Sequence, residues 1–96
     1  MPQGYVYILA SKRNGTLYTG MTTDLPARIT AHRDGRGSIF TRRYSVKFLV
    51  WFERHDLVVD AIQRETSLKR WPRKWKLQLI ERTNPDWLDL YETLNT

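Results

Sequence analysis

The feature that most constrains the fold is a pair of short β-rich segments joined by a tight turn. Residues Tyr5–Ala10 form an almost wholly apolar run, and extended character resumes over Leu17–Met21 after the Asn14-Gly15 pair. Asn-Gly is a strong hairpin signal because both residues tolerate the positive φ that two-residue turns require. A run without polar alternation is typical of a strand that is covered on both faces. The sequence therefore predicts an antiparallel hairpin whose first strand lies centrally in its sheet.

Length and composition limit the rest of the fold and its partners. With 96 residues and no cysteine, the chain is expected to form one domain over residues 1–96 without a disulfide or thiolate zinc site, which fits a reducing compartment. Its 16 Lys and Arg exceed its 10 Asp and Glu, and the net charge of +6 favours polyanionic partners such as nucleic acid. No apolar run approaches the roughly 20 residues of a membrane span, and the start lacks signal-peptide features. We expect a cytoplasmic protein without membrane association.

Helical and extended signals follow each other after the hairpin. Pro26 near a first turn and Gly35 at the end predict a helix over Leu25–Asp34. A third strand is expected over Val46–Glu53, because large side chains dominate this segment. Its two faces would carry Phe48, Val50 and Phe52 on one side and Lys47, Leu49 and Trp51 on the other. Strands and helices in this order indicate an α+β domain.

A second helix is predicted over Leu57–Arg70, with Asp56 as its N-cap. Helical spacing places Glu65 within an apolar stripe that also contains Val58, Ala61, Ile62 and Leu68. A carboxylate directed toward the body of a protein is costly unless it is paired or bound to a metal. Glu65 is therefore either a metal ligand or the partner of an arginine beneath the helix.

The C-terminal part of the chain predicts a third helix and a packed tail. The helix is expected from Pro72 to about Arg82, and its inner face would carry Trp75, Leu79 and Ile80. We assign Trp71 and Trp75 to the core instead of to base stacking. The turn at 84–86 precedes an apolar segment, 87–94, that is expected to pack on the body as a short helical element.

Two groups of basic residues are candidates for nucleic-acid contact. One is the glycine-bearing segment Gly35–Ser45, expected to be a loop, with Arg36, Arg42 and Arg43 and with Phe40 and Tyr44 available to stack on bases. The other is a basic rim on the later helices that includes Lys69 and Lys74. For both groups a purely solvated surface remains the alternative.

Five further residues have the chemistry that phosphodiester cleavage requires. Tyrosine can act as a base, arginine can bind a phosphate oxygen, and a carboxylate can hold a divalent metal. Arg28 and His32 are four residues apart on the first predicted helix, so both project from one face, although a solvated face is the alternative. Tyr7 and Tyr18 lie on the predicted hairpin, and Glu65 lies on the second predicted helix.

The order of these residues resembles the GIY-YIG nuclease domain family, in particular its small stand-alone bacterial members. The resemblance rests on Tyr5-Val6-Tyr7, Tyr18-Thr19-Gly20, Arg28, His32 and Glu65, with support from the runs 61–65 and 84–87, and it covers most of the chain. The first segment has Tyr-Val-Tyr in place of Gly-Ile-Tyr, and Thr19 stands where isoleucine is usual. Larger members have an asparagine beyond the metal-binding helix, and whether Asn84 fills that place is left open.

The resemblance implies a three-stranded antiparallel sheet flanked by helices and a metal-dependent DNA endonuclease. Tyr18 would be the general base with Tyr7 in support, Arg28 would bind the scissile phosphate, and His32 would assist. Glu65 would be the only protein carboxylate on a Mg²⁺ or Mn²⁺ ion, so water and substrate oxygens would complete its coordination. Gly20 would allow close backbone approach.

The residues themselves leave two other functions open. One is a non-catalytic nucleic-acid-binding module, which predicts salt-sensitive binding that is indifferent to Mg²⁺ and to Glu65. The other is a protein-interaction domain, which predicts a large exposed apolar patch. Nothing in the sequence selects a base sequence or excludes RNA, so branched or single-stranded DNA in repair or recombination is an expectation. A protein partner or a dimer could supply specificity.

Overall fold

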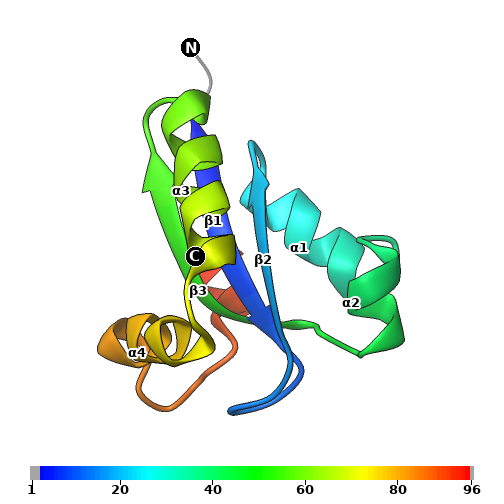
Figure 1. Ribbon diagram of the computed structural model, residues 1–96. Coiled ribbons are helices and arrows are strands. Elements are labelled where there is room, and N and C mark those ends of the chain that lie inside the picture. Colours follow the sequence, from blue (N-terminus) through cyan, green and yellow to red (C-terminus); the bar gives the residue numbers. More distant parts are fainter. Residues whose placement is uncertain (1–2, 96) are drawn as a thin grey trace.

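The computed structural model describes residues 3–95 and shows a three-stranded sheet between two layers of helices (Figure 1). The central strand β1 (Gly4–Ala10) pairs antiparallel with β2 (Leu17–Thr22) on one side and with β3 (Phe48–His55) on the other. The predicted α+β class, the hairpin and the central place of its first strand are confirmed. The third strand begins two residues later than predicted and extends to His55.

The sheet divides the interior into two cores, which explains the uninterrupted apolar run of β1. Val6, Ile8 and Ala10 point into a core with the helices that follow β3, whereas Tyr7 and Leu9 point into a second core with the helix that follows β2. All five side chains are buried. Because β1 is covered on both faces, the side chains on each face must be apolar or must have hydrogen-bond partners for their polar groups.

The predicted alternation of the third strand is wrong. A register shift between Ile8 and Leu9 marks a β-bulge, since Ile8 faces Trp51 but Leu9 faces Leu49. The extra residue, Val50, joins Trp51 in the first core, and Phe48 is left exposed at the start of the strand. A bulge of this kind interrupts the two-residue period because two residues on one strand oppose one on the other.

The helix α1 (Leu25–Arg33) follows the prediction closely, and Asp24 caps it by accepting a hydrogen bond from the Ala27 backbone N–H. The segment expected to be a loop contains a second helix, α2 (Ile39–Arg43), which corrects that prediction. Ser38 caps α2 by accepting from the backbone N–H of Thr41. A helix this short shows no detectable apolar period, so only its capping serine signals it.

The helix α3 (Val58–Arg70) crosses the sheet close to β1. A Cβ on Gly4 would overlap the Ala61 side chain, so glycine at this position allows the helix to approach the strand. The predicted cap is wrong: Leu57 occupies the N-cap position without a side-chain bond, and Asp56 instead pairs with Arg54. Ile62, expected to be buried, is 46% exposed because α3 contacts the core through a narrower stripe around Ala61 and Leu68.

The last elements are α4 (Arg73–Thr83) and the 3₁₀ helix η1 (Leu90–Asn95). The residues Leu79 and Ile80 enter the first core as predicted, but Trp75 lies on the outer side of α4 and is 52% exposed. Partly buried side chains of η1 pack on the second core, as expected for the tail. Within the residues that the structure describes, no helix has the length and apolar character needed to cross a bilayer.

Candidate active site

The centre of the site is a hydrogen bond between two buried side chains from different elements. The Tyr7 hydroxyl, on the middle of β1, lies 2.9 Å from His32 Nε2, in the last turn of α1. Both residues are only 1% exposed. Gly20 faces Tyr7 across the strand pair, and a Cβ there would overlap the Tyr7 hydroxyl. Glycine therefore makes room for the ring to lie over β2.

His32 makes a second hydrogen bond through its other ring nitrogen. His32 Nδ1 lies 3.1 Å from Thr41 Oγ1, which also lies 3.2 Å from the Ser38 carbonyl and 3.0 Å from Ser38 Oγ. When Thr41 directs its proton to Ser38, its oxygen can accept the Nδ1 proton of His32, and in that tautomer Nε2 is free to accept the Tyr7 proton. Burial and the nearby Arg28 charge lower the pKa of His32 to about 4, so the ring is neutral at pH 7.

Arg28 lies one turn before His32 on α1, on the same side of the helix as predicted. Its guanidinium donates to the Gly37 carbonyl at 3.2 Å and interacts with the hydroxyls of Tyr7 and Tyr18, which raises the pKa of Arg28. Burial raises the pKa of Tyr7 to about 12, because it outweighs the opposing effect of Arg28. The solvated-face alternative for Arg28 and His32 is excluded, since both side chains are tied into this cluster.

Tyr18 lies at the outer side of the cluster and begins a row of aromatic rings. Its ring centroid is 5.4 Å from that of His32 and 6.1 Å from that of Phe40, and Phe40 is 4.9 Å from Tyr44. The guanidinium of Arg43 lies 5.6 Å from the Tyr44 ring. The helix α2 thus extends the site with aromatic surface and positive charge.

Glu65 projects from α3 and is 21% exposed at its side chain. Its partner is Lys69, with Oε2 and Nζ 3.4 Å apart, and not an arginine beneath the helix. The negative charge of Glu65 contributes to raising the pKa of Tyr7, so the carboxylate lies within electrostatic reach of the cluster. Among residues 3–95 no group of three or more His, Cys, Asp or Glu could hold a metal ion. A single carboxylate with a weak lysine contact fits Mg²⁺, which retains several waters in protein sites.

The predicted nucleic-acid residues fall into three places. Arg42 and Arg43 lie in the last turn of α2, and Arg36 lies before this helix, where it pairs with Asp34 at 2.9 Å. Lys69 pairs with Glu65 and lies near Arg73 and Lys76, since both Lys69 and Arg73 help to lower the pKa of Lys76, which burial lowers most. Lys74 lies on the exposed first turn of α4.

Asn84 is not part of this cluster. It is buried, donates to the carbonyls of Val50 and Leu88, and accepts from the Leu88 N–H. These three hydrogen bonds have a structural role, because they hold the end of α4 against β3. Two residues that do support the cluster, Ser38 and Thr41, were not predicted. Their spacing as a capping pair was the available signal.

The fold and this cluster define a member of the GIY-YIG family: the model of the GIY-YIG catalytic domain matches residues 3–78, and the chain belongs to that family. A UPF0213 protein of Staphylococcus haemolyticus is 40% identical over 81 residues, which cover 84% of this chain and 98% of that protein. A UPF0213 protein of Clostridium perfringens is 45% identical over 76 residues, covering 79% and 81% of the two chains.

A solved structure agrees with this assignment. The solution NMR structure of a UPF0213 protein from Bacillus halodurans aligns with a TM-score of 0.57 and 32% identity, over 91% of this chain and 92% of that one. The chain is thus similar in size and fold to small members of a nuclease family.

Proposed function

We propose that the protein is a metal-dependent endonuclease that hydrolyses DNA phosphodiester bonds in the cytoplasm. The observation that carries the proposal is the cluster in which Tyr7, Arg28 and His32 meet from two elements, with Tyr18 beside them and Glu65 within electrostatic reach. Membership of a nuclease family supports the same chemistry.

Proton handling favours Tyr7 over Tyr18 as the group that activates water. Tyr7 is protonated at neutral pH, so it can accept a water proton only while it passes its own proton to an acceptor. In the tautomer that carries its proton on Nδ1, neutral His32 offers Nε2 as that acceptor, 2.9 Å from the Tyr7 hydroxyl. As the water oxygen bonds to phosphorus, the bond from phosphorus to the leaving sugar oxygen breaks, and the leaving oxygen takes up a proton from solvent. The water proton moves to the Tyr7 oxygen and the Tyr7 proton moves to His32. Tyr18 has no comparable acceptor at its hydroxyl among the described residues and would position the substrate.

Charge stabilisation falls to Arg28 and to the metal. The Arg28 guanidinium can donate to a phosphoryl oxygen as negative charge grows there, which lowers the barrier more than it stabilises the bound substrate. We propose that Glu65 holds Mg²⁺ or Mn²⁺, which when bound would act as a Lewis acid toward the phosphate. Lys69, four residues further on α3, would remain close enough to contact a flanking phosphate.

The substrate is proposed to be recognised by shape. The basic residues around the site can contact phosphates, and such contacts position a nucleic acid without reading its sequence. We therefore propose branched, flapped or single-stranded DNA as substrate, in repair or recombination, with a protein partner or dimer as a possible source of further specificity.

The test is cleavage of supercoiled plasmid, single strands, branched DNA and matched RNA with Mg²⁺, Mn²⁺ or EDTA. The parent should cleave DNA with either metal and not with EDTA. Glu65→Gln should abolish cleavage, whereas Glu92→Gln, which removes an exposed carboxylate on η1, should not. Cleavage that survives EDTA or Glu65→Gln would contradict the metal role, and cleavage of RNA alone would contradict the choice of DNA.

A non-catalytic binding module is the second candidate function, because the rings of Tyr18, Phe40 and Tyr44 form a continuous row with Arg43 at its end. Such a row suits base stacking whether or not the site cleaves. Salt-sensitive DNA binding by a parent that cleaves none of these substrates, unchanged by Mg²⁺ and by Glu65→Gln, would support this candidate.

A further inference from the structure

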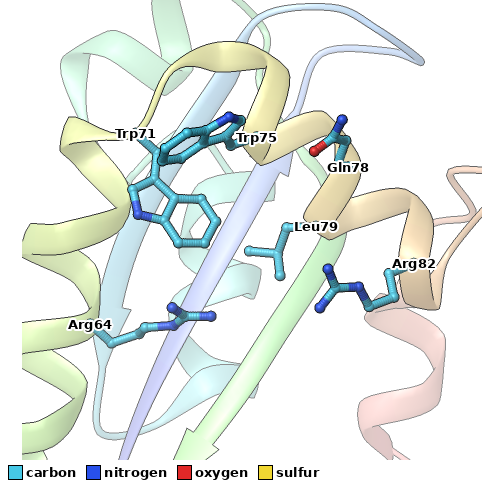
Figure 2. A pocket seen from close by; sticks show the side chains of 6 residues that line it. All are labelled: Arg64, Trp71, Trp75, Gln78, Leu79 and Arg82. Atoms are coloured by element: carbon cyan, nitrogen blue, oxygen red, sulfur yellow. The ribbon is translucent and has the colours of Figure 1, made fainter.

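A second site lies where the end of α3 meets α4, apart from the tyrosine–histidine cluster. A cavity of about 220 Å³ lies between these helices, and Figure 2 shows the side chains that line it. It is lined by Arg64, Trp71, Trp75, Gln78, Leu79 and Arg82. This volume is below the roughly 300–1,000 Å³ of typical small-molecule sites, so the cavity suits one ring system of a larger ligand.

Two indole rings form the aromatic walls of this cavity. The rings of Trp71 and Trp75 are nearly perpendicular, at 83°, with centroids 5.8 Å apart. Trp75 is 52% exposed, although a tryptophan that serves only packing is normally well covered. An uncovered indole beside a concave surface is a platform on which a planar ring can stack.

Two guanidinium groups complete the cavity. Arg64 lies 5.2 Å from the centroid of the Trp71 ring and is held by its Nε, which donates to Glu53 Oε1 at 3.1 Å. Its terminal nitrogens are directed toward the cavity, and Arg82 reaches toward the same space from α4 (Figure 2). Within residues 3–95 the structure gives the Arg82 side chain no hydrogen bond or ion pair with another residue. The site therefore offers positive charge next to an apolar ring platform.

We propose that this cavity binds an unpaired nucleobase of single-stranded DNA. The base would stack on Trp75 and Trp71, Gln78 would contact its polar edge, and Arg64 and Arg82 would contact the flanking phosphates. The choice of DNA rests on the proposed function, but the binding does not depend on cleavage.

The position of the cavity supports a link to the cleavage site. Arg64 and Glu65 are neighbours on α3, so they lie on adjacent faces of one helix. Burial lowers the pKa of Lys76 most, and the nearby charges of Arg73 and Lys69 lower it further, so these three cations from the same two helices lie close to one another around Lys76. A strand anchored in the cavity could follow these cations toward Glu65, which predicts a preference for DNA with a single-stranded branch.

The test is tryptophan fluorescence of Glu65→Gln in EDTA, so that cleavage plays no part. Of the four tryptophans, Trp51 and Trp87 are buried, so quenching by a ligand reports on Trp71 and Trp75. A short oligothymidylate should quench the signal and bind at least about fivefold more tightly than an abasic oligonucleotide of equal length, since each stacked base contributes that much or more. In the same background Trp75→Ala should remove this difference, and Trp75→Phe should keep most of it.

Two variants that each lose one positive charge distinguish binding in the cavity from non-specific electrostatic attraction of DNA. Arg82→Gln should weaken oligothymidylate binding more than Arg54→Gln, which removes an exposed arginine paired with Asp56 near the end of β3. Circular dichroism would establish that each variant is folded. Equal affinity for the two oligonucleotides, equal loss from the two arginine variants, or quenching by a proline-rich peptide but not by DNA would overturn the proposal. Cleavage without base-dependent quenching would overturn it while leaving the nuclease intact.

Discussion

Two tyrosines of similar chemistry differ in their surroundings, and this difference supports the roles that we propose for them. Tyr7 is buried and hydrogen-bonded to His32, whose other ring nitrogen contacts Thr41, whereas Tyr18 is half-buried and packs its ring between His32 and Phe40. Proton transfer requires an acceptor in contact, and the described residues provide one only for Tyr7.

Removal of each hydroxyl in turn tests this assignment. Tyr7→Phe should lower the single-turnover cleavage rate by roughly 10²–10⁴-fold, as loss of a general base does, and should lower the free energy of unfolding by about 1 kcal/mol through the lost hydrogen bond. Tyr18→Phe, the matched control, should retain most of the rate. A larger loss in Tyr18→Phe than in Tyr7→Phe would return the role of base to Tyr18.

The neutral state of His32 predicts a stability that depends on pH. Its pKa falls from 6.5 in the unfolded chain to about 4 in the fold, so the unfolded state binds more protons between these values. The free energy of unfolding should be highest above pH 6.5 and should fall by roughly 2–3 kcal/mol as pH drops toward 4. Urea denaturation across this range measures the change.

The chain offers its own control for this pH effect. In His32→Asn the free energy of unfolding should lose most of its dependence on pH between 4 and 6.5. In His55→Gln, which removes the other histidine, this dependence should remain. Equal slopes in the two variants would show that His32 is not the residue responsible.

At the scale of the elements, two close approaches bring the site together. The short helix α2 places Thr41 against His32, and Gly37, just before α2, packs so closely that a Cβ would overlap the imidazole. On the other face of the sheet, Gly4 allows α3 to approach β1, and α3 carries Glu65. Small shifts of either helix would therefore separate the groups that we propose to act together.

The contact between β1 and α3 can be tested by moving a methyl group from Ala61 on the helix to Gly4 on the strand. Gly4→Ala should destabilise the protein by about 1–3 kcal/mol, because the added Cβ overlaps Ala61, and should lower cleavage by displacing Glu65. The double variant Gly4→Ala/Ala61→Gly should recover part of both losses. Denaturation and cleavage of the two single variants and the double variant form a cycle, and strict additivity would show that the two sites do not interact.

At the scale of the whole molecule, the sheet separates the two halves of the site. The tyrosine–histidine cluster belongs to the face covered by α1, and Glu65 belongs to the helix on the opposite face. Figure 1 shows β2 as the edge strand between α1 and α3. A substrate that meets both groups must therefore lie across this edge, where the Gly20 backbone takes the place of a side chain.

The net charge of +6 predicts the salt dependence of binding. The logarithm of the association constant for DNA should fall linearly with the logarithm of salt concentration. Each variant that loses a phosphate contact, such as Arg43→Gln or Lys69→Gln, should reduce the slope by about 1. Glu92→Gln should leave it unchanged. Binding to the metal-free Glu65→Gln protein at several salt concentrations measures the slopes, and an unchanged slope in both cation variants would contradict these contacts.

Local interactions explain which parts of the structure were predictable. The hairpin, α1, α4 and most of α3 depend on turn residues, caps and apolar spacing within a few residues of each other. The residues of the proposed site were identified for a different reason: their order along the chain resembles that of the family. Both kinds of information are present in the sequence before the chain folds.

Other features depended on residues that are distant in sequence. The bulge opposite Ile8 and the exposed face of Trp75 follow from how strands and helices pack, and no local pattern encodes either one. The hydrogen bond between Tyr7 and His32 joins residues 25 positions apart. Thr41 binds the other ring nitrogen of His32 from α2, a helix too short to show an apolar period in the sequence. The sequence by itself determined most of the elements, because these depend on local interactions, and the order of its residues supplied the candidates for the site. The tertiary structure alone decided which tyrosine hydrogen-bonds to the histidine, since burial and hydrogen-bond partners arise only when distant segments pack together.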